Sequence, residues 1–510
     1  MLSPCVGDTR GRRCDRIPPL MRPSLLFTLL CLLPRSAEAV GADVGGYLRV
    51  GTRPDFQGGD GRLGYWNLYG RLLNEGPYAT LDFRLDVLEQ QPGTVAPWTS
   101  VHLRVEGGSI GNADSLGGAL SAFRLSQAYI QAGNVLFSDL TWQVGTLDFY
   151  FGDLGLYDMR PAQIFYETVG LSAMVDRGPV QLLLGAGDSG YQVKGSEYNT
   201  LLTGGGALRL RPFKGLELGV GGQVRYEPKV VGNRFAQHQT PDVDYEDWLR
   251  GEVVQQYANQ APIELLDFPD PVPTDASSWK GIGYLGFGGA GPLVWNNAFF
   301  SLERLHPQGA NTESYDGTDY RIYATELTDQ RTVLLMGNEL QLRLVPRRLD
   351  LVLAGLYGDH RDGDNDLAPS DHDRLYASGV GRLQAYASDT VHFLAETSYA
   401  REKSRNGNLY REHADSIFAN TGGEPDTDGF ENGDSDVRRT WQGKTGVVLN
   451  PLGTGVYTRP SLRLLYGIQY SNQNNAFGNS FVESLDQYDD FQTVEQHWHH
   501  LVAIEAEAWF

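Results

Sequence analysis

Residues 501–510 read Leu-Val-Ala-Ile-Glu-Ala-Glu-Ala-Trp-Phe, and apolar side chains occupy every second position. One face of this stretch carries Glu505 and Glu507 together with Trp509. The opposite face is entirely apolar, with Val502, Ile504, Ala506, Ala508 and Phe510. A period of two predicts a β-strand with unlike faces, a pattern that soluble antiparallel sheets and membrane barrels share.

An export signal favours the membrane barrel. Residues 21–39 have a basic start, an apolar centre and a small-residue end, the three parts of a secretory signal peptide. We expect cleavage after Ala39 and interpret residues 1–20 as an upstream extension before Met21. Because no backbone edge faces lipid in an outer membrane, we expect the last strand to pair with the first and close a barrel.

The composition excludes several classes of protein. The chain has 42 Lys and Arg against 63 Asp and Glu, a net charge of -21, which disfavours binding to nucleic acid. The mean hydropathy is -0.34 and no long apolar run follows residue 39, so a helical membrane protein is excluded. All three cysteines, Cys5, Cys14 and Cys31, precede the expected cleavage site, and we expect no disulfide.

The alternating pattern recurs along the whole chain. In the first strand Tyr47 and Arg49 lie on the polar face, and Leu48 lies on the apolar face. We therefore expect Tyr47 and Trp509 to be neighbours inside a pore. Further strands are predicted at 78–89, 100–106, 120–132, 138–147, 168–176, 179–188, 204–212, 216–226, 279–290, 296–304, 332–344, 349–358, 373–387, 391–402, 437–450, 457–470 and 496–510.

Short turns and long polar loops alternate between these strands, as in an outer-membrane barrel. The predicted fold is all-β: one transmembrane antiparallel barrel of 18 strands over residues 40–510, in an outer membrane of Gram-negative type. The long loops are extracellular and the short turns periplasmic, and the barrel is wide enough for a water-filled channel. Long polar loops are predicted at 52–75, 189–203, 227–278, 305–331, 403–436 and 471–495.

Several segments together resemble the maltoporin family, the trimeric sugar-specific porins of outer membranes. The similarity is spread over most of the chain after the signal peptide and is densest in 45–165 and 437–510. It is carried by Gly46-Tyr47-Leu48-Arg49, Arg71-Leu72-Leu73-Asn74-Glu75 with Tyr78, Phe123-Arg124 with Ala128–Leu136, Arg459-Pro460 with Leu462-Arg463, and Trp509.

The resemblance implies a line of aromatic side chains along the channel, flanked by charged residues. Aromatic rings stack on the apolar face of a pyranose, while charged groups exchange hydrogen bonds with its hydroxyls. The aromatic positions implied are Tyr47, Tyr78, Trp509 and Tyr376, with Tyr284 as a further candidate. The polar track implied is Arg49, Arg71 and Arg124, to which alternation adds Asp82, Arg84, Arg104 and Glu106.

The loop at 148–167 corresponds to the family's inward-folded constriction. Its implied residues are Asp153 and Asp158, with Tyr157 and Arg160 beside them. The chain departs from the family at Phe151, where the family has an arginine, and at Arg160, where it has an aromatic residue. It also has Thr80 in place of an acid. These departures leave the identity of the sugar open.

Sequence reasoning thus favours a passive sugar channel that needs no cofactor. We expect it to be a homotrimer and to contact outer-membrane lipid and lipopolysaccharide. A general diffusion porin is the alternative within the same class. A barrel enzyme is disfavoured because no nucleophile elbow is present and no His is evident beside a Ser and an acid. A receptor or adhesin would use residues 227–278. No metal site is predicted, because His497 and His499 share a face without a third ligand.

Overall fold

The barrel is seen in a computed structural model, which describes residues 41–56, 61–64, 66–90, 94–108, 123–189, 200–228, 238–241, 275–307, 311–315, 318–323, 331–362, 374–404, 437–472 and 497–510. The expected extension and signal peptide, residues 1–39, lie outside this part of the chain, as do most residues of the predicted long loops beyond residue 189.

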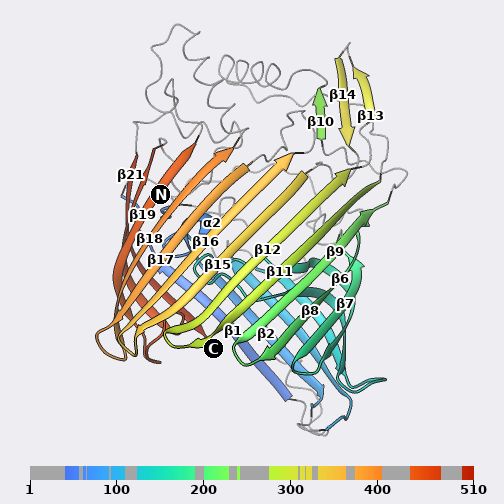
Figure 1. The fold of residues 1–510 in the computed structure, drawn as a ribbon, viewed down its shortest axis with the longest axis horizontal. Coiled ribbons are helices and arrows are strands. Elements are labelled where there is room, and N and C mark those ends of the chain that lie inside the picture. The colour runs from blue at the N-terminus through green and yellow to red at the C-terminus, as the bar shows by residue number, and fades with distance from the viewer. Residues whose placement is uncertain are drawn as a thin grey trace, which may run out of the picture.

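Eighteen antiparallel strands form one closed sheet (Figure 1). Each strand pairs with its neighbours in the chain order, which confirms the predicted fold class. The strands are β1 (Gly41–Thr52), β2 (Tyr78–Leu88), β3 (Trp98–Gly108), β4 (Phe123–Gly133), β5 (Leu140–Tyr150), β6 (Gln163–Asp176), β7 (Val180–Asp188), β8 (Leu202–Phe213), β9 (Leu216–Glu227), β11 (Ala276–Ala290), β12 (Leu293–Pro307), β15 (Arg331–Val345), β16 (Leu349–Asp362), β17 (Arg374–Tyr386), β18 (Val391–Ser404), β19 (Arg438–Leu449), β20 (Ser461–Ser471) and β21 (Trp498–Trp509).

The two ends of the sheet meet as the sequence predicts. Strand β1 pairs with β21 in a register that sets Tyr47 opposite Trp509 and Arg49 opposite Glu507. The amide of Gly46 donates to the carbonyl of Phe510 at 2.9 Å, and the amide of Phe510 donates back at 3.1 Å. In Figure 1 the C-terminus lies at the end of the barrel where the short turns lie.

The two faces of each strand differ as the alternation requires. On β21, Ile504 is 49% exposed on the outer surface, whereas Glu505 is only 2% exposed on the inner one. The same holds on β2, where Leu81, Phe83 and Leu85 are exposed outside. Among the described residues, no helix is long and apolar enough to cross a membrane.

Part of the predicted loop 52–75 is a buried plug inside the barrel. The described segment 61–64 and 66–75 includes the short helix α2 (Trp66–Tyr69) and buries Leu63, Leu68 and Leu73. The composition of residues 52–75, rich in Gly and Asp, predicted a polar extracellular loop. That prediction is wrong for the leucine-rich part, because its side chains pack against the barrel wall instead of meeting water.

Two other segments also differ from the prediction. Strand β20 begins at Ser461, not at 457, because Tyr457 turns into the barrel and its hydroxyl donates to Glu339 at 2.7 Å. The predicted long loops 227–278 and 305–331 contain strands that form a small separate sheet. These strands are β10 (His238–Pro241), β13 (Asn311–Tyr315) and β14 (Thr318–Tyr323).

An arginine introduced on the outer face of the barrel should destabilise the fold more near the middle of the membrane than near its edge. Leu353→Arg, in the body of β16 and exposed outside, should lower the free energy of unfolding from lipid vesicles by about 2–4 kcal/mol. Leu344→Arg, beside the turn after β15, is the matched control and should cost roughly 0–1 kcal/mol. Equal costs at the two positions, measured by urea titration of vesicle-folded protein, would contradict an outward lipid-facing band.

Candidate solute passage

Three aromatic side chains lie in a row on the inner wall. The ring centre of Tyr47 is 5.9 Å from that of Tyr78 and 6.4 Å from that of Trp509. They come from the three adjacent strands β1, β2 and β21. Trp509 is 57% exposed, and both tyrosines are half-buried. We call these residues the aromatic row.

Carboxylates orient the two tyrosines of the row. The Tyr47 hydroxyl donates to Glu507 at 2.6 Å, and the Tyr78 hydroxyl donates to Glu106 at 2.9 Å. Each ring is therefore fixed at its polar end while part of its surface stays open. Such an arrangement suits a ligand with an apolar face.

A ladder of ion pairs lies beside the aromatic row on β2, β3 and β4. It consists of Arg84–Asp86 at 2.8 Å, Arg104–Asp82 at 2.9 Å and Arg124–Glu106 at 2.9 Å. The side chains of Arg124 and Asp82 are 65% and 46% exposed. Because these groups remain open to water, they can exchange hydrogen bonds with a passing solute. The ladder contains the predicted Asp82, Arg84 and Arg124.

Arg49 and Arg71, also predicted for the polar track, have a different environment. Arg49 is 3% exposed; it pairs with Glu75 and donates to the carbonyl of Gly76 at 2.9 Å. Arg71 pairs with Glu507 at 3.0 Å and with Glu75 at 3.2 Å. Both guanidinium groups therefore hold the plug against β1 and β21. The burial of Arg49 corrects its expected role in direct solute contact, whereas Arg71 is only half-buried.

Glu507 is the centre of this buried network. It accepts the ion pairs of Arg71 and of Arg459, the latter at 2.6 Å, and also pairs with Arg463. With the Tyr47 hydroxyl, four donors converge on one carboxylate. Such convergence satisfies the lone pairs of a charge removed from water.

The predicted constriction loop 148–167 is shorter in the structure, because β5 runs to Tyr150 and β6 begins at Gln163 and the two strands pair there. The segment between them, 151–162, reaches the opposite wall of the barrel. The amide of Leu156 donates to Glu339 of β15 at 2.9 Å, and the Tyr157 hydroxyl lies 3.0 Å from Ser378 Oγ of β17. The amide of Arg71 donates to the carbonyl of Leu156 at 2.8 Å, which joins the loop to the plug. Tyr157 is 0% exposed, so it anchors the loop and cannot meet a solute.

The charged residues of the loop are more open. Asp153 is exposed, and the side chains of Asp158 and Arg160 are 35% and 38% exposed. Burial on its own would raise the pKa of Asp158, but Arg71 and Arg49 outweigh it and hold that pKa below its ordinary value. Asp158 therefore stays ionised at neutral pH and presents a negative charge in the barrel.

Tyr376 does not extend the aromatic row. It lies on β17, is 7% exposed, and has the Arg374 guanidinium 5.2 Å from its ring centre. Tyr284 is also buried, with its ring stacked on Phe151 at 5.7 Å. Both rings belong to the hydrophobic core between the constriction loop and the wall. Neither offers a face for a sugar, which corrects the prediction for Tyr376.

A second buried network holds the plug against β17, β18 and β19. Lys444 pairs with Glu396 at 2.9 Å and donates to the carbonyl of Tyr69 at 2.8 Å. The Tyr69 hydroxyl donates to Glu402 at 2.7 Å. Glu396 also pairs with Arg382, and Glu402 with Arg374 and Arg438. Sequence reasoning missed these residues, although their inward position follows from strand alternation.

Inward glycines receive the side chains of the plug and of the loop. A Cβ at Gly219 would lie 2.6 Å from Phe151, and one at Gly337 would lie 2.6 Å from Leu154. A Cβ at Gly467 would lie 2.6 Å from Leu73. Close approach of another chain segment is a common reason for glycine within a strand. These glycines are a sequence signal for inward-folded segments.

The interior is therefore asymmetric among the described residues. The constriction loop contacts strands from β9 to β17, and the plug packs on β17 to β21 and is joined to β1 by the pair of Arg49 with Glu75. The exposed aromatic row and the ion-pair ladder lie on β21 and β1 to β4. In the same part of the chain, no group of three or more His, Cys, Asp or Glu side chains is placed to hold a metal ion.

No protein-family model matches the chain, and no curated protein matches it in sequence. Solved structures that align with it include OccD3 (OpdP) of Pseudomonas aeruginosa, with 11% identity, 92% of this chain and 91% of the other covered, and a TM-score of 0.40. OmpT of Vibrio cholerae aligns with 7% identity, coverages of 93% and 99%, and a TM-score of 0.40.

Wzi of Escherichia coli, described as an outer-membrane protein involved in group 1 capsule assembly and as a carbohydrate-binding β-barrel, aligns with 13% identity, coverages of 91% and 84%, and a TM-score of 0.36. The class of this protein follows from its own geometry. A closed 18-strand barrel, apolar outside and charged inside, is a channel-like β-barrel of the Gram-negative outer membrane.

The network around Glu507 predicts a large effect of removing its charge. Glu507→Gln leaves Arg71, Arg459 and Arg463 without their shared partner, and should lower the free energy of unfolding by roughly 3–5 kcal/mol. Asp389→Asn breaks the exposed pair with Arg347 and should cost less than about 1 kcal/mol. Urea unfolding in detergent micelles that gave similar values for both variants would contradict the buried network.

Proposed function

We propose that this protein is a passive outer-membrane channel for sugars, taking maltodextrin-like linear oligosaccharides along the aromatic row. The observation that carries the proposal is the contact of Tyr47 with both Tyr78 and Trp509, beside a ladder of exposed ion pairs. A pyranose has C–H groups on its faces and hydroxyls around its rim, and this wall offers a partner for each. The driving force is the concentration gradient alone.

The shape of the interior supports guided transport over free diffusion. The plug and the constriction loop fill part of the interior, while the row and the ladder keep exposed surface on β21 and β1 to β4. We expect a solute that crosses the barrel to pass near both. Adjacent weak sites allow transfer from ring to ring without a deep trap. A general diffusion porin would share the ion pairs but would not need three rings in contact.

A barrel enzyme is less consistent with the geometry. The structure does place His102 Nε2 2.9 Å from Ser100 Oγ, a pair that sequence reasoning did not find. Ser100 is completely buried, however, and His102 stacks on Tyr129 at 4.6 Å. The hydroxyl is therefore out of reach of a substrate. Residues 229–237 and 242–274, on which a receptor or adhesin would depend, lie outside the described part.

We further propose a homotrimer in contact with outer-membrane lipid and lipopolysaccharide, as the resemblance to maltoporins implies. The apolar outer face of β1, β2 and β21 is compatible with either lipid or a second copy of the barrel. In planar bilayers, a trimer would insert in conductance steps of three equal levels.

The same bilayers test sugar transport. Linear maltodextrins should block the ion current, and Tyr78→Ala or Trp509→Ala should weaken the blocking constant about two- to tenfold, because each ring contact contributes roughly 0.5–1.5 kcal/mol. Tyr399→Ala, on the lipid-facing side of β18, is the control and should leave the block unchanged. A current that no sugar blocks would favour the general diffusion porin.

A further inference from the structure

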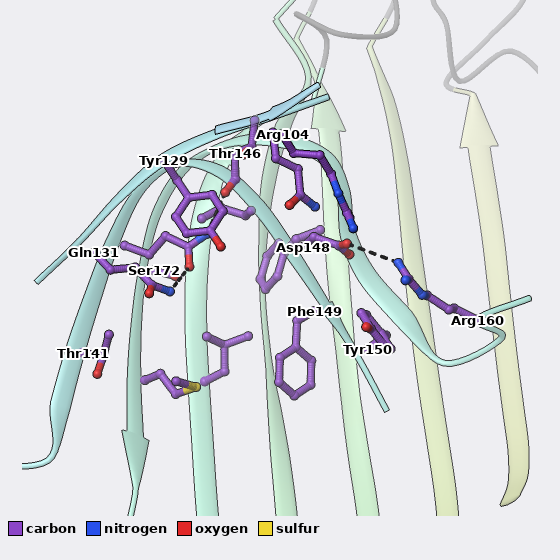
Figure 2. A pocket seen from close by; sticks show the side chains of 16 residues that line it. Arg104, Tyr129, Gln131, Thr141, Thr146, Asp148, Phe149, Tyr150, Arg160 and Ser172 are labelled. Atoms are coloured by element: carbon purple, nitrogen blue, oxygen red, sulfur yellow. Dashed lines mark hydrogen bonds and ion pairs between the residues drawn. The ribbon is translucent and has the colours of Figure 1, made fainter. Parts of the chain in front are cut away.

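A polar hollow opens on the inner wall away from the aromatic row. Its volume is about 320 Å³, and it is lined by residues of β3 to β7 and of the constriction loop (Figure 2). None of the residues of the aromatic row lines it. This volume lies at the lower end of the range for small-molecule sites, about 300–1,000 Å³.

Amide side chains form an ordered polar surface in this hollow. The side-chain amide of Gln131 donates to Gln143 Oε1 at 3.0 Å, and Gln143 in turn donates to the carbonyl of Thr146 at 2.7 Å. These bonds fix the orientation of both amides before any ligand arrives. Tyr129 and Thr141 line the same hollow and are labelled with Gln131 in Figure 2.

Two hydroxyl groups of the lining form no hydrogen bond within the described part of the protein. In the part of the chain that the structure describes, the hydroxyls of Tyr129 and Thr141 form no hydrogen bond with another protein group. They stay available to a ligand, in contrast to the paired hydroxyls of Tyr47 and Tyr78. Free groups beside pre-oriented amides are the arrangement of a polar recognition site.

The charges of the hollow are balanced. Asp148 lies 3.8 Å from Arg160 and accepts a hydrogen bond from Gln163 at 2.7 Å. Arg104 is engaged by Asp82 at 2.9 Å. Each cation thus has an acid beside it, so the lining favours a neutral ligand over an anion.

The remaining surface of the hollow is apolar and aromatic. Leu147, Phe165 and Leu183 are buried members of its lining. The Arg160 guanidinium covers the Tyr150 ring at 4.1 Å, and the Tyr129 ring rests on His102. A hexose has the matching combination of an apolar face and several hydroxyls, whereas a purely apolar ligand would leave the amides unsatisfied.

We propose that this hollow is a second binding site, which takes a single neutral hexose unit independently of the aromatic row. The ring of Tyr129 meets a face of the sugar. Gln131, Gln143 and Thr141 exchange hydrogen bonds with its hydroxyls, and Asp148 accepts from a further hydroxyl. The inference goes beyond transport along the row, because the site would hold a monosaccharide at the side of the passage.

Equilibrium dialysis of radiolabelled D-glucose against the refolded full-length protein tests the site. Gln143→Ala and Thr141→Val should each weaken glucose binding about fivefold, because each removes one hydrogen-bonding group. Thr141→Val nearly preserves shape and breaks no internal bond. Gln341→Ala, on the inner wall of β15, is the matched control and should bind as the unaltered protein does. Heat-modified migration on gels verifies that every variant is folded.

The double variant Tyr78→Ala/Trp509→Ala separates the two sites. It should lose most of the maltodextrin block and still bind glucose. Loss of glucose binding in this variant, or unchanged glucose binding in both Gln143→Ala and Thr141→Val, would overturn the second site. The second site would also fail if the protein bound gluconate but not glucose. A maltodextrin block that survives the double variant would overturn the aromatic row and leave the glucose result to stand alone.

Discussion

The whole structure depends on the pairing of β1 with β21. In a bilayer there is no water to satisfy the edge of a sheet, so a spanning sheet must close on itself. The register of that closure sets Tyr47 opposite Trp509 and Arg49 opposite Glu507. It thereby places an aromatic pair and the centre of a charge network on the same seam. A shift of β1 by one residue would turn Tyr47 and Arg49 toward lipid.

The alternation of side chains made the barrel wall predictable. A period of two is a local property, and each strand shows it in its own residues, as β21 does with Ile504 and Glu505. The neighbourhood of Tyr47 and Trp509 followed because closure makes the two terminal strands adjacent and alternation puts both side chains on the inner face. The exposed ladder followed in the same way, since Asp82, Arg84 and Arg124 stand at inward positions.

The contents of the barrel were much less predictable. The alternating pattern of a strand predicts which side chains point into the lumen. It does not predict whether water or another segment of the chain covers them. Arg49 and Arg124 both occupy inward positions, yet Arg49 is buried beneath the plug and Arg124 is exposed. The burial of Tyr157 and Tyr376 likewise depends on long-range contacts between the constriction loop and β17. The composition of residues 61–75 predicted a polar loop, because the leucines there are spread among glycine and polar residues. In the structure these leucines are buried.

The glycines on the inner wall have a consequence for how such a channel diversifies. Gly337 leaves room for Leu154, and Gly219 leaves room for Phe151, so the constriction loop sits close to the wall. A larger residue in either place would displace the loop from the wall into the lumen. The channel would then become narrower, although no residue that contacts the solute had changed. The width of the channel and its selectivity for solutes are thus set by separate residues. Evolution can change one of them without the other.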